Sequence, residues 1–188
     1  RSIKFTKLYN YFLNLDQKKQ KNLFRIHNKI NGKLNLSSDR IYSSRNLVKS
    51  LESRIIFNNG NILIEQFLIN LGKLGAADML GMVNNEKKLT HLKFESNIFL
   101  DSKKKFLSKL GIFNKENFPF NFFVSGNFDL DNLRVSFYEI YENEKLNNED
   151  INFIEKQFND IMLDEGFKSL FYFAQFKEFV KTLTNEVD

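Results

Sequence analysis

The sequence contains no cysteine, no tryptophan and a single proline among its 188 residues. The absence of cysteine excludes disulfides, a thiol nucleophile and thiolate metal ligands, and it fits a reducing compartment such as the cytoplasm or an organelle matrix. Histidine is almost as scarce, because only His27 and His91 are present, and the chain has no Gly-x-Ser-x-Gly motif. These absences predict a protein that is not an enzyme, with no catalytic residue, no cofactor and no metal site.

Long apolar runs are missing as well. The most apolar segment, 62–83, is interrupted by Glu65, Lys73 and Asp78, so no run of about 20 apolar residues is present to cross a bilayer. The first 20 residues lack the continuous apolar core of a signal peptide, so we expect none within them, and Arg1, which is not a natural start, leaves a removed preceding segment open. We therefore expect a globular protein without a transmembrane segment.

Asparagine and phenylalanine are abundant instead, with 25 and 22 copies. Such usage is typical of an A/T-rich genome, so part of the net charge of +5 is background. The distribution of charge is not explained in this way. Residues 1–110 carry 21 basic and 8 acidic side chains, a net of +13, whereas residues 111–188 carry 7 and 15, a net of −8. This division predicts a basic part that attracts polyanions, followed by an acidic part.

Apolar residues of the basic part recur at helical spacing. The expected helices are 3–14, 17–30 after an N-cap at Asp16, a segment from Ser43 or Ser44 to Asn58, 62–83 as one helix or a helix pair, and Ser102 to Leu110.

The pattern changes near the only proline. Two runs rich in aromatic and β-branched residues, 120–124 and 133–141, predict a β-hairpin or small antiparallel sheet near 118–141. The Asp-Leu-Asp-Asn sequence at 129–132 is expected to form the turn, because the glycine and glutamate of a calcium loop are missing.

Helical spacing returns at the C-terminal end. One amphipathic helix is expected after a cap at 147–148 and before Gly166, and another over 170–183. The predicted fold class is therefore mainly α (α+β), a helical bundle with one hairpin and two C-terminal amphipathic helices. We divide it into a basic helical part, 1–110, and an acidic Phe-rich hairpin with a helix pair, 111–188, within one compact domain.

The segment NLGKLGAADMLG, residues 70–81, places three of the eight glycines inside the most apolar run. A Gly-x-x-Gly loop of the KH type needs an aliphatic residue where Asp78 stands, and the Lys-Ser/Thr pair of a P-loop is missing. Small residues such as Gly72 and Ala76 are instead four apart, which places them on one face of a helix. We expect a tightly packed elbow of the helical core, with a break near Gly72.

Clustered basic residues are the strongest positive feature. Several accessible cations together bind phosphates in a salt-dependent manner. The candidate nucleic-acid-binding residues are Lys18, Lys19, Lys21, Arg25, Lys29, Lys33, Arg40, Arg45, Lys103, Lys104 and Lys105. The leading hypothesis is a non-enzymatic basic protein that docks its N-terminal half on RNA or a ribonucleoprotein such as a ribosome.

Three alternatives stay open. Fourteen of the 22 phenylalanines follow Gly111, so residues 113–183 are a candidate surface for a protein partner, as in an adaptor or a structural subunit. An anionic membrane surface is a less favoured partner of the basic face. An enzyme would need a closed pocket that joins further carboxylates to His91 and Glu95, which share a face if this segment is helical.

Overall fold

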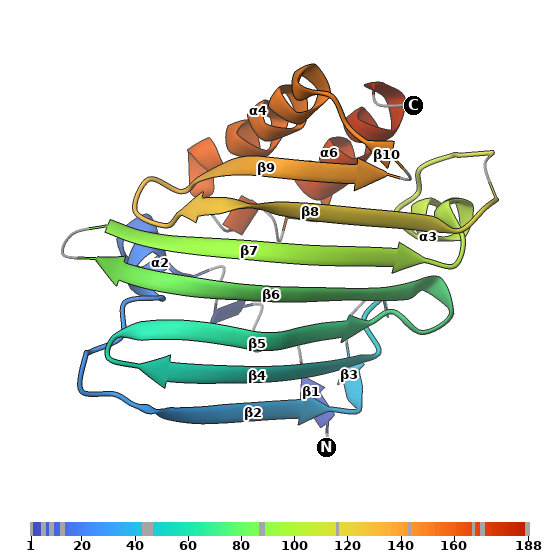
Figure 1. Cartoon of the computed structure of the whole chain (residues 1–188). Helices are drawn as coiled ribbons and strands as arrows, with labels where there is room; N and C mark the ends of the chain where they lie inside the picture. Colours follow the sequence, from blue (N-terminus) through green and yellow to red (C-terminus); the bar gives the residue numbers. More distant parts are fainter. Residues whose placement is uncertain are drawn as a thin grey trace.

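The protein is built on one large antiparallel sheet, as a computed structural model shows (Figure 1). The structure describes residues 2–4, 7, 10–11, 14–42, 47–86, 89–115, 117–142, 144–166, 168–169 and 172–186. Eight strands follow one another across the sheet in the order β2-β4-β5-β6-β7-β8-β9-β10. Their bounds are β2 Gly32–Ser38, β4 Ser50–Asn58, β5 Asn61–Asn70, β6 Gly75–Glu86, β7 Leu89–Leu100, β8 Phe120–Asp129, β9 Arg134–Glu142 and β10 Glu144–Lys145. Two short strands, β1 Ser2–Lys4 and β3 Arg40–Tyr42, pair in parallel as a second sheet.

Helices cover one face of the large sheet, which we term the inner face (Figure 1). At the β8–β9 end, Val124 and Ile140 of the sheet pack with Ile151 and Ile154 of a C-terminal helix. The core continues across the sheet, where Ile62 of β5 belongs to one cluster with Val135 of β9 and Met162 of the same C-terminal helix. The helical segments are α2 Gln17–Asn22, the 3-10 turn η1 Gly72–Leu74, α3 Lys103–Lys109, α4 Asn148–Glu165 and α6 Phe173–Glu186.

The predicted helical bundle is wrong, because residues 50–58, 61–70 and 75–86 form strands, joined by a hairpin turn at 59–60 and a short 3-10 turn at 72–74. The strands misled the helical interpretation because their apolar residues lie on both faces. Ile55 and Ile56 are adjacent and both are partly buried. In addition, the register of β5 against β6 shifts between Ile64 and Phe67. A bulge of this kind breaks the period of two that identifies a strand, and it brings apolar residues close to helical spacing.

The break at NNGN, residues 58–61, was the missed signal. Asn59 and Gly60 both have positive φ, 50° and 85°, and Asn58 pairs with Asn61 across the turn between β4 and β5. Two central residues with positive φ are the requirement of the tight hairpin turn for which Asn-Gly is the preferred sequence. A strand pair on either side follows from that turn, and a helix does not.

The N-terminal segments differ from prediction too. The helix expected at 17–30 is present only as α2, which begins after the Asp16 cap and ends at Asn22. The range 3–14 begins in strand β1, and much of its remainder lies outside the described residues.

The predictions for the C-terminal part are closer to the structure. The hairpin near 118–141 is confirmed as β8 and β9. Asn147 caps α4 by accepting the backbone N–H of Asp150, and the helix ends at Gly166. Ser102 likewise caps α3.

Side chains of α4 close the outer edge of β9. The Asn159 amide accepts the backbone N–H of Val135 at 2.8 Å and donates to its carbonyl oxygen at 2.9 Å, as a neighbouring strand would. Glu155 accepts the backbone N–H of Phe137 at 3.0 Å. These contacts satisfy polar groups that an exposed edge would leave open to another chain. They also fix α4 against the sheet, and with it one wall of the space described next.

Candidate ligand-binding cavity

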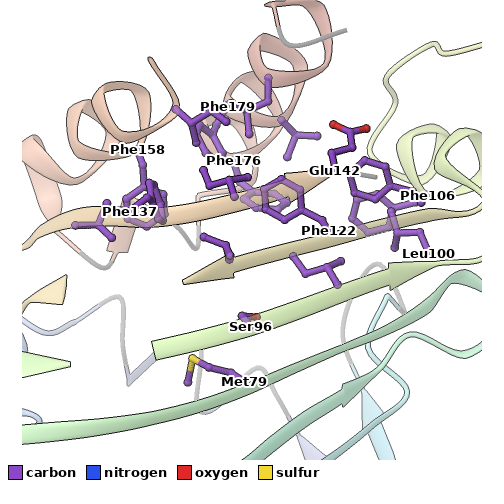
Figure 2. Close-up of a pocket in the computed structure, with 18 of the residues that line it drawn as sticks. Met79, Ser96, Leu100, Phe106, Phe122, Phe137, Glu142, Phe158, Phe176 and Phe179 are labelled. Carbon is purple, nitrogen blue, oxygen red and sulfur yellow. The ribbon is translucent and has the colours of Figure 1, made fainter. Parts of the chain in front are cut away.

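A cavity of about 420 Å³ lies between the inner face of β6 to β9 and the three helices α3, α4 and α6 (Figure 2). Its described lining is almost entirely apolar. The lining residues are Met79, Phe94, Ser96, Ile98, Leu100, Lys103, Phe106, Leu107, Phe120, Phe122, Val124, Phe128, Val135, Phe137, Ile140, Glu142, Ile154, Phe158, Phe176, Phe179, Val180 and Leu183.

The local structure explains why this lining is apolar. Every second residue of a strand points to the same face, so the alternation in β8 brings Phe120, Phe122 and Val124 to the cavity. On α6, Phe176 and Val180 are four residues apart and therefore lie on one side of the helix. The sheet therefore supplies the floor of the cavity through every second residue of a strand, and the helices supply its roof through residues three or four apart.

Two glycines shape the floor around Phe94. In the sheet register, Gly81 of β6 and Gly126 of β8 lie opposite Phe94, one on each side. A Cβ on Gly126 would lie 2.6 Å from the carbonyl oxygen of Ser136 and 3.1 Å from the Phe94 ring. The missing side chain of Gly126 leaves room for the Phe94 ring on the inner face, where it packs edge-to-face on Phe137 with centroids 6.4 Å apart.

Aromatic contacts hold the helical roof on the sheet. The ring of Phe158 on α4 packs edge-to-face on Phe128, Phe137 and Phe179, with centroid separations of 6.4, 6.0 and 5.9 Å. These contacts join the two strands and the two helices at one side of the cavity (Figure 2). The cavity therefore has a fixed wall on this side.

The polar side chains of the described lining are Ser96, Lys103 and Glu142. The Ser96 hydroxyl donates to the carbonyl oxygen of Asp78 at 2.6 Å. The ammonium of Lys103 lies 3.6 Å from a carboxylate oxygen of Glu142, with 5% of the lysine side chain and 20% of the glutamate side chain exposed. It also lies 5.6 Å from the centre of the Phe120 ring, within the range of a cation–π contact. The cavity thus has one charged corner, beside α3.

The structure separates the predicted basic residues. Figure 1 places α2, with exposed Lys18 and Lys19, and α3, with exposed Lys104 and Lys105, at opposite ends of the strands. Lys103 is buried in the cavity wall. The other candidates divide into exposed Lys29, Lys33 and Arg40, partly buried Lys21, Arg25 in an ion pair with Asp131, and Arg45, which lies outside the described residues.

The proposed His91–Glu95 pair rested on a helix that is a strand. Both side chains are on β7, where four residues span about 13 Å, so their shared face does not bring them into contact. His91 instead lies near Asn127, 3.4 Å from its amide nitrogen. Within the described chain, no three side chains of histidine, cysteine, aspartate or glutamate are grouped to hold a metal ion.

The turn at 129–132 has the Asx chemistry expected for it. Burial of Asp129 opposes its ionisation, but its carboxylate accepts the backbone N–H groups of Asn132 and Asp131, each at 2.9 Å, and the Asn132 side chain at 2.7 Å. These bonds and the nearby His91 outweigh the burial and hold the pKa of Asp129 below its ordinary value.

The glycine-rich segment 70–81 is not an elbow between helices, because it comprises the end of β5, the 3-10 turn η1 and the first seven residues of β6. Its key residue is Gly75, with φ of 134°. A Cβ at Gly75 would lie 1.9 Å from the carbonyl oxygen of Phe99, so the close approach of β6 and β7 at this point requires glycine. The segment is close-packed, but the close contact is between the backbones of two neighbouring strands and not between two helices.

The fold and cavity define a class in physical terms: an antiparallel sheet with helices on one face and an apolar cavity between the two layers. Comparison with protein-family models, characterised proteins and solved structures finds no match to the chain. Among the described helices, none is both long and apolar enough to span a membrane.

Proposed function

We propose that the protein binds a small, predominantly apolar ligand in the cavity. The observation that carries this proposal is a space of about 420 Å³ with three polar side chains in its described lining, one of which is engaged by backbone. Small-molecule sites commonly have volumes of about 300–1,000 Å³, mostly apolar walls and a few placed polar groups. The cavity has these properties.

Packing arguments favour a ligand over an empty core. Protein interiors are packed as densely as organic crystals, and voids larger than a water molecule are few. The space is partly open to solvent, but its apolar walls offer the water inside it few hydrogen-bonding partners, which favours replacement of that water by an apolar molecule. Each methylene group moved from water into this space would contribute about 0.8 kcal/mol. A ligand therefore supplies contacts that the lining side chains otherwise lack.

The test is a titration with the neutral fluorescent probe N-phenyl-1-naphthylamine, which brightens in apolar surroundings. Ile98 lies on the floor of the cavity, so Ile98→Trp should fill part of the space and weaken probe binding roughly tenfold or more. Phe99→Trp is the matched control, because Phe99 is the next residue of the same strand, points to the opposite face and is 46% exposed. Equal binding by all three proteins would contradict the proposal.

Binding of a polyanion by the basic surface is a second candidate function. The exposure of Lys18, Lys19, Lys29 and Lys33 supports it, together with the net +13 of residues 1–110. RNA or a ribonucleoprotein in a reducing compartment would be the partner. Generic RNA should bind near 50 mM salt, and its affinity should fall steeply as salt rises. The absence of binding, or an affinity independent of salt, would exclude this function.

A further inference from the structure

We infer that the ligand is a single-chain amphiphile whose anionic head is held by Lys103, with its tail along the phenylalanines of the cavity. This inference rests on the proposed function and specifies its ligand class. It starts from the uneven placement of charge in the cavity. In Figure 2, Glu142 lies beside Phe106 and Leu100 near α3, whereas Phe137 and Phe158 lie at the other side. A ligand with one charged end and one apolar end matches this arrangement.

The charged head of such a ligand can be bound only at the Lys103–Glu142 corner of the described lining. The Ser96 hydroxyl is directed to the carbonyl oxygen of Asp78, so it belongs to the sheet. The remaining described lining is hydrocarbon and one thioether, which bind a tail but do not bind a charged head. A charged head therefore has one favourable position in the cavity.

The sign of the head follows from the charges around that corner. The helix α3, KKKFLSK, carries four lysines and no acid. Lys177 of α6 adds a further ammonium beyond the C-terminal end of α3, 3.3 Å from where a Cβ on Gly111 would stand. Against these, Glu142 is the one carboxylate of the described lining, with Asp101 exposed just before α3. The surplus of positive charge favours an anion over a cation.

The two charges are not closely hydrogen-bonded to each other, so a ligand oxygen can compete for the ammonium of Lys103. A hydrogen-bonded ammonium and carboxylate are about 2.7–2.9 Å apart, whereas Lys103 and Glu142 are separated by 3.6 Å. Lys103 and Glu142 both have further contacts beside this pair, and an ammonium group carries three N–H donors, so a ligand oxygen would compete for one of them. Because the lysine side chain is only 5% exposed, its attraction for the ligand is weakly screened by salt.

The experiment compares ligands that share one dodecyl tail and differ in the charge of the head group. Dodecanoate, dodecyl phosphate, dodecanol and dodecylamine compete with N-phenyl-1-naphthylamine for the protein at neutral pH, below their critical micelle concentrations. We expect both anions to bind roughly tenfold or more tightly than the alcohol, and the amine to bind more weakly than the alcohol. The carboxylate and phosphate arms separate the two chemical sources of an anionic head.

Variants of Lys103 and Glu142 test whether this pair causes the preference for an anionic head. Lys103→Met keeps the length of the side chain and removes its charge, so the ratio of dodecanoate to dodecanol affinity should fall to about one. Glu142→Gln should raise that ratio, because it removes the competing carboxylate. Lys104→Met is the matched control on the same helix, where the side chain is exposed, and should leave the ratio unchanged. The double variant Lys103→Met with Glu142→Gln avoids an unpaired charge, and it should also lose the preference if Lys103→Met fails to fold.

The outcomes separate the two proposals. If the probe does not bind the wild-type protein, the proposed function fails. If the probe binds and the alcohol competes as well as the anions, the cavity is a ligand site and the assignment to Lys103 is overturned. A preference for dodecylamine, or an anion preference that survives in the double variant, would overturn it in the same way.

Discussion

The buried ammonium of Lys103, at the start of α3, lies 3.6 Å from the carboxylate of Glu142, at the end of β9. The two residues are far apart in the sequence, and their ion pair joins α3 to the sheet across a corner of the apolar cavity. Both charges are held in surroundings that otherwise favour hydrocarbon. An ion pair in this position costs desolvation, so its two members should depend on each other.

Removal of one member should therefore destabilise the fold. For Lys103→Met we expect a loss of about 1–3 kcal/mol in the free energy of unfolding, below the roughly 3–5 of fully buried pairs because Glu142 is 20% exposed. The double variant with Glu142→Gln should recover much of that loss. Urea denaturation measures both values, and additive losses in the double variant would show that the pair is not coupled.

The contact between α4 and the edge of β9 should also be measurable. Asn159→Leu removes the partner of both backbone groups of Val135, and we expect a loss of about 2 kcal/mol. Asn152→Ala is the control, because Asn152 is exposed on the same helix. If the two variants unfold at the same urea concentration, the Asn159 contacts do not stabilise this edge.

Gly75 provides a test of the sheet topology. The variant Gly75→Ala places a Cβ where the Phe99 carbonyl stands and strains a backbone with φ of 134°, so a loss of at least about 3 kcal/mol is expected. Gly32→Ala is the control, since nothing lies within 4 Å of its Cβ, and it should change stability by less than about 1 kcal/mol. Chemical denaturation measures both losses. If Gly75→Ala is as stable as wild type, β6 and β7 do not approach each other closely at this point.

The Asp129 turn should make stability depend on pH. Since the folded state lowers the pKa of Asp129, its contribution is fully present above the unfolded pKa of about 3.8 and is lost as pH falls through the folded value. Asp129→Asn keeps an acceptor oxygen and removes the titration. The difference in unfolding free energy between wild type and variant should be largest near pH 5 and shrink toward pH 2. A difference that is constant over this range would contradict the assignment.

The sequence predicted the C-terminal part better than the rest for a physical reason. The elements there have distinct local signals, such as the Asn147 cap, the stop at Gly166 and the Asx turn after Asp129. The strands from Ser50 to Glu86 lack the simple period of two, because both faces carry apolar residues and bulges shift the register. Their apolar spacing alone does not separate such strands from buried helix, and the Asn59–Gly60 turn is the local signal that does.

The cavity could not be predicted from local sequence patterns. The stripe of Phe176 and Phe179 on α6 was predicted as an amphipathic face, and Phe120 and Phe122 as part of a strand. Whether such faces meet in a filled core or around a space depends on how the layers are spaced in three dimensions. The excess of phenylalanine after Gly111, read as a possible protein interface, is partly used in this lining. Exposed Phe113 and Phe118 leave the adaptor hypothesis a prediction.

Calorimetric titration of dodecanoate into wild type, Ile98→Trp and Phe99→Trp tests the central claim most directly. The cavity predicts one bound ligand per chain in wild type and in Phe99→Trp, with affinity at least about tenfold weaker in Ile98→Trp. An affinity for dodecanoate that is the same in Ile98→Trp as in wild type, or the absence of binding of both dodecanoate and N-phenyl-1-naphthylamine to wild type, would contradict a ligand site between the sheet and its helices.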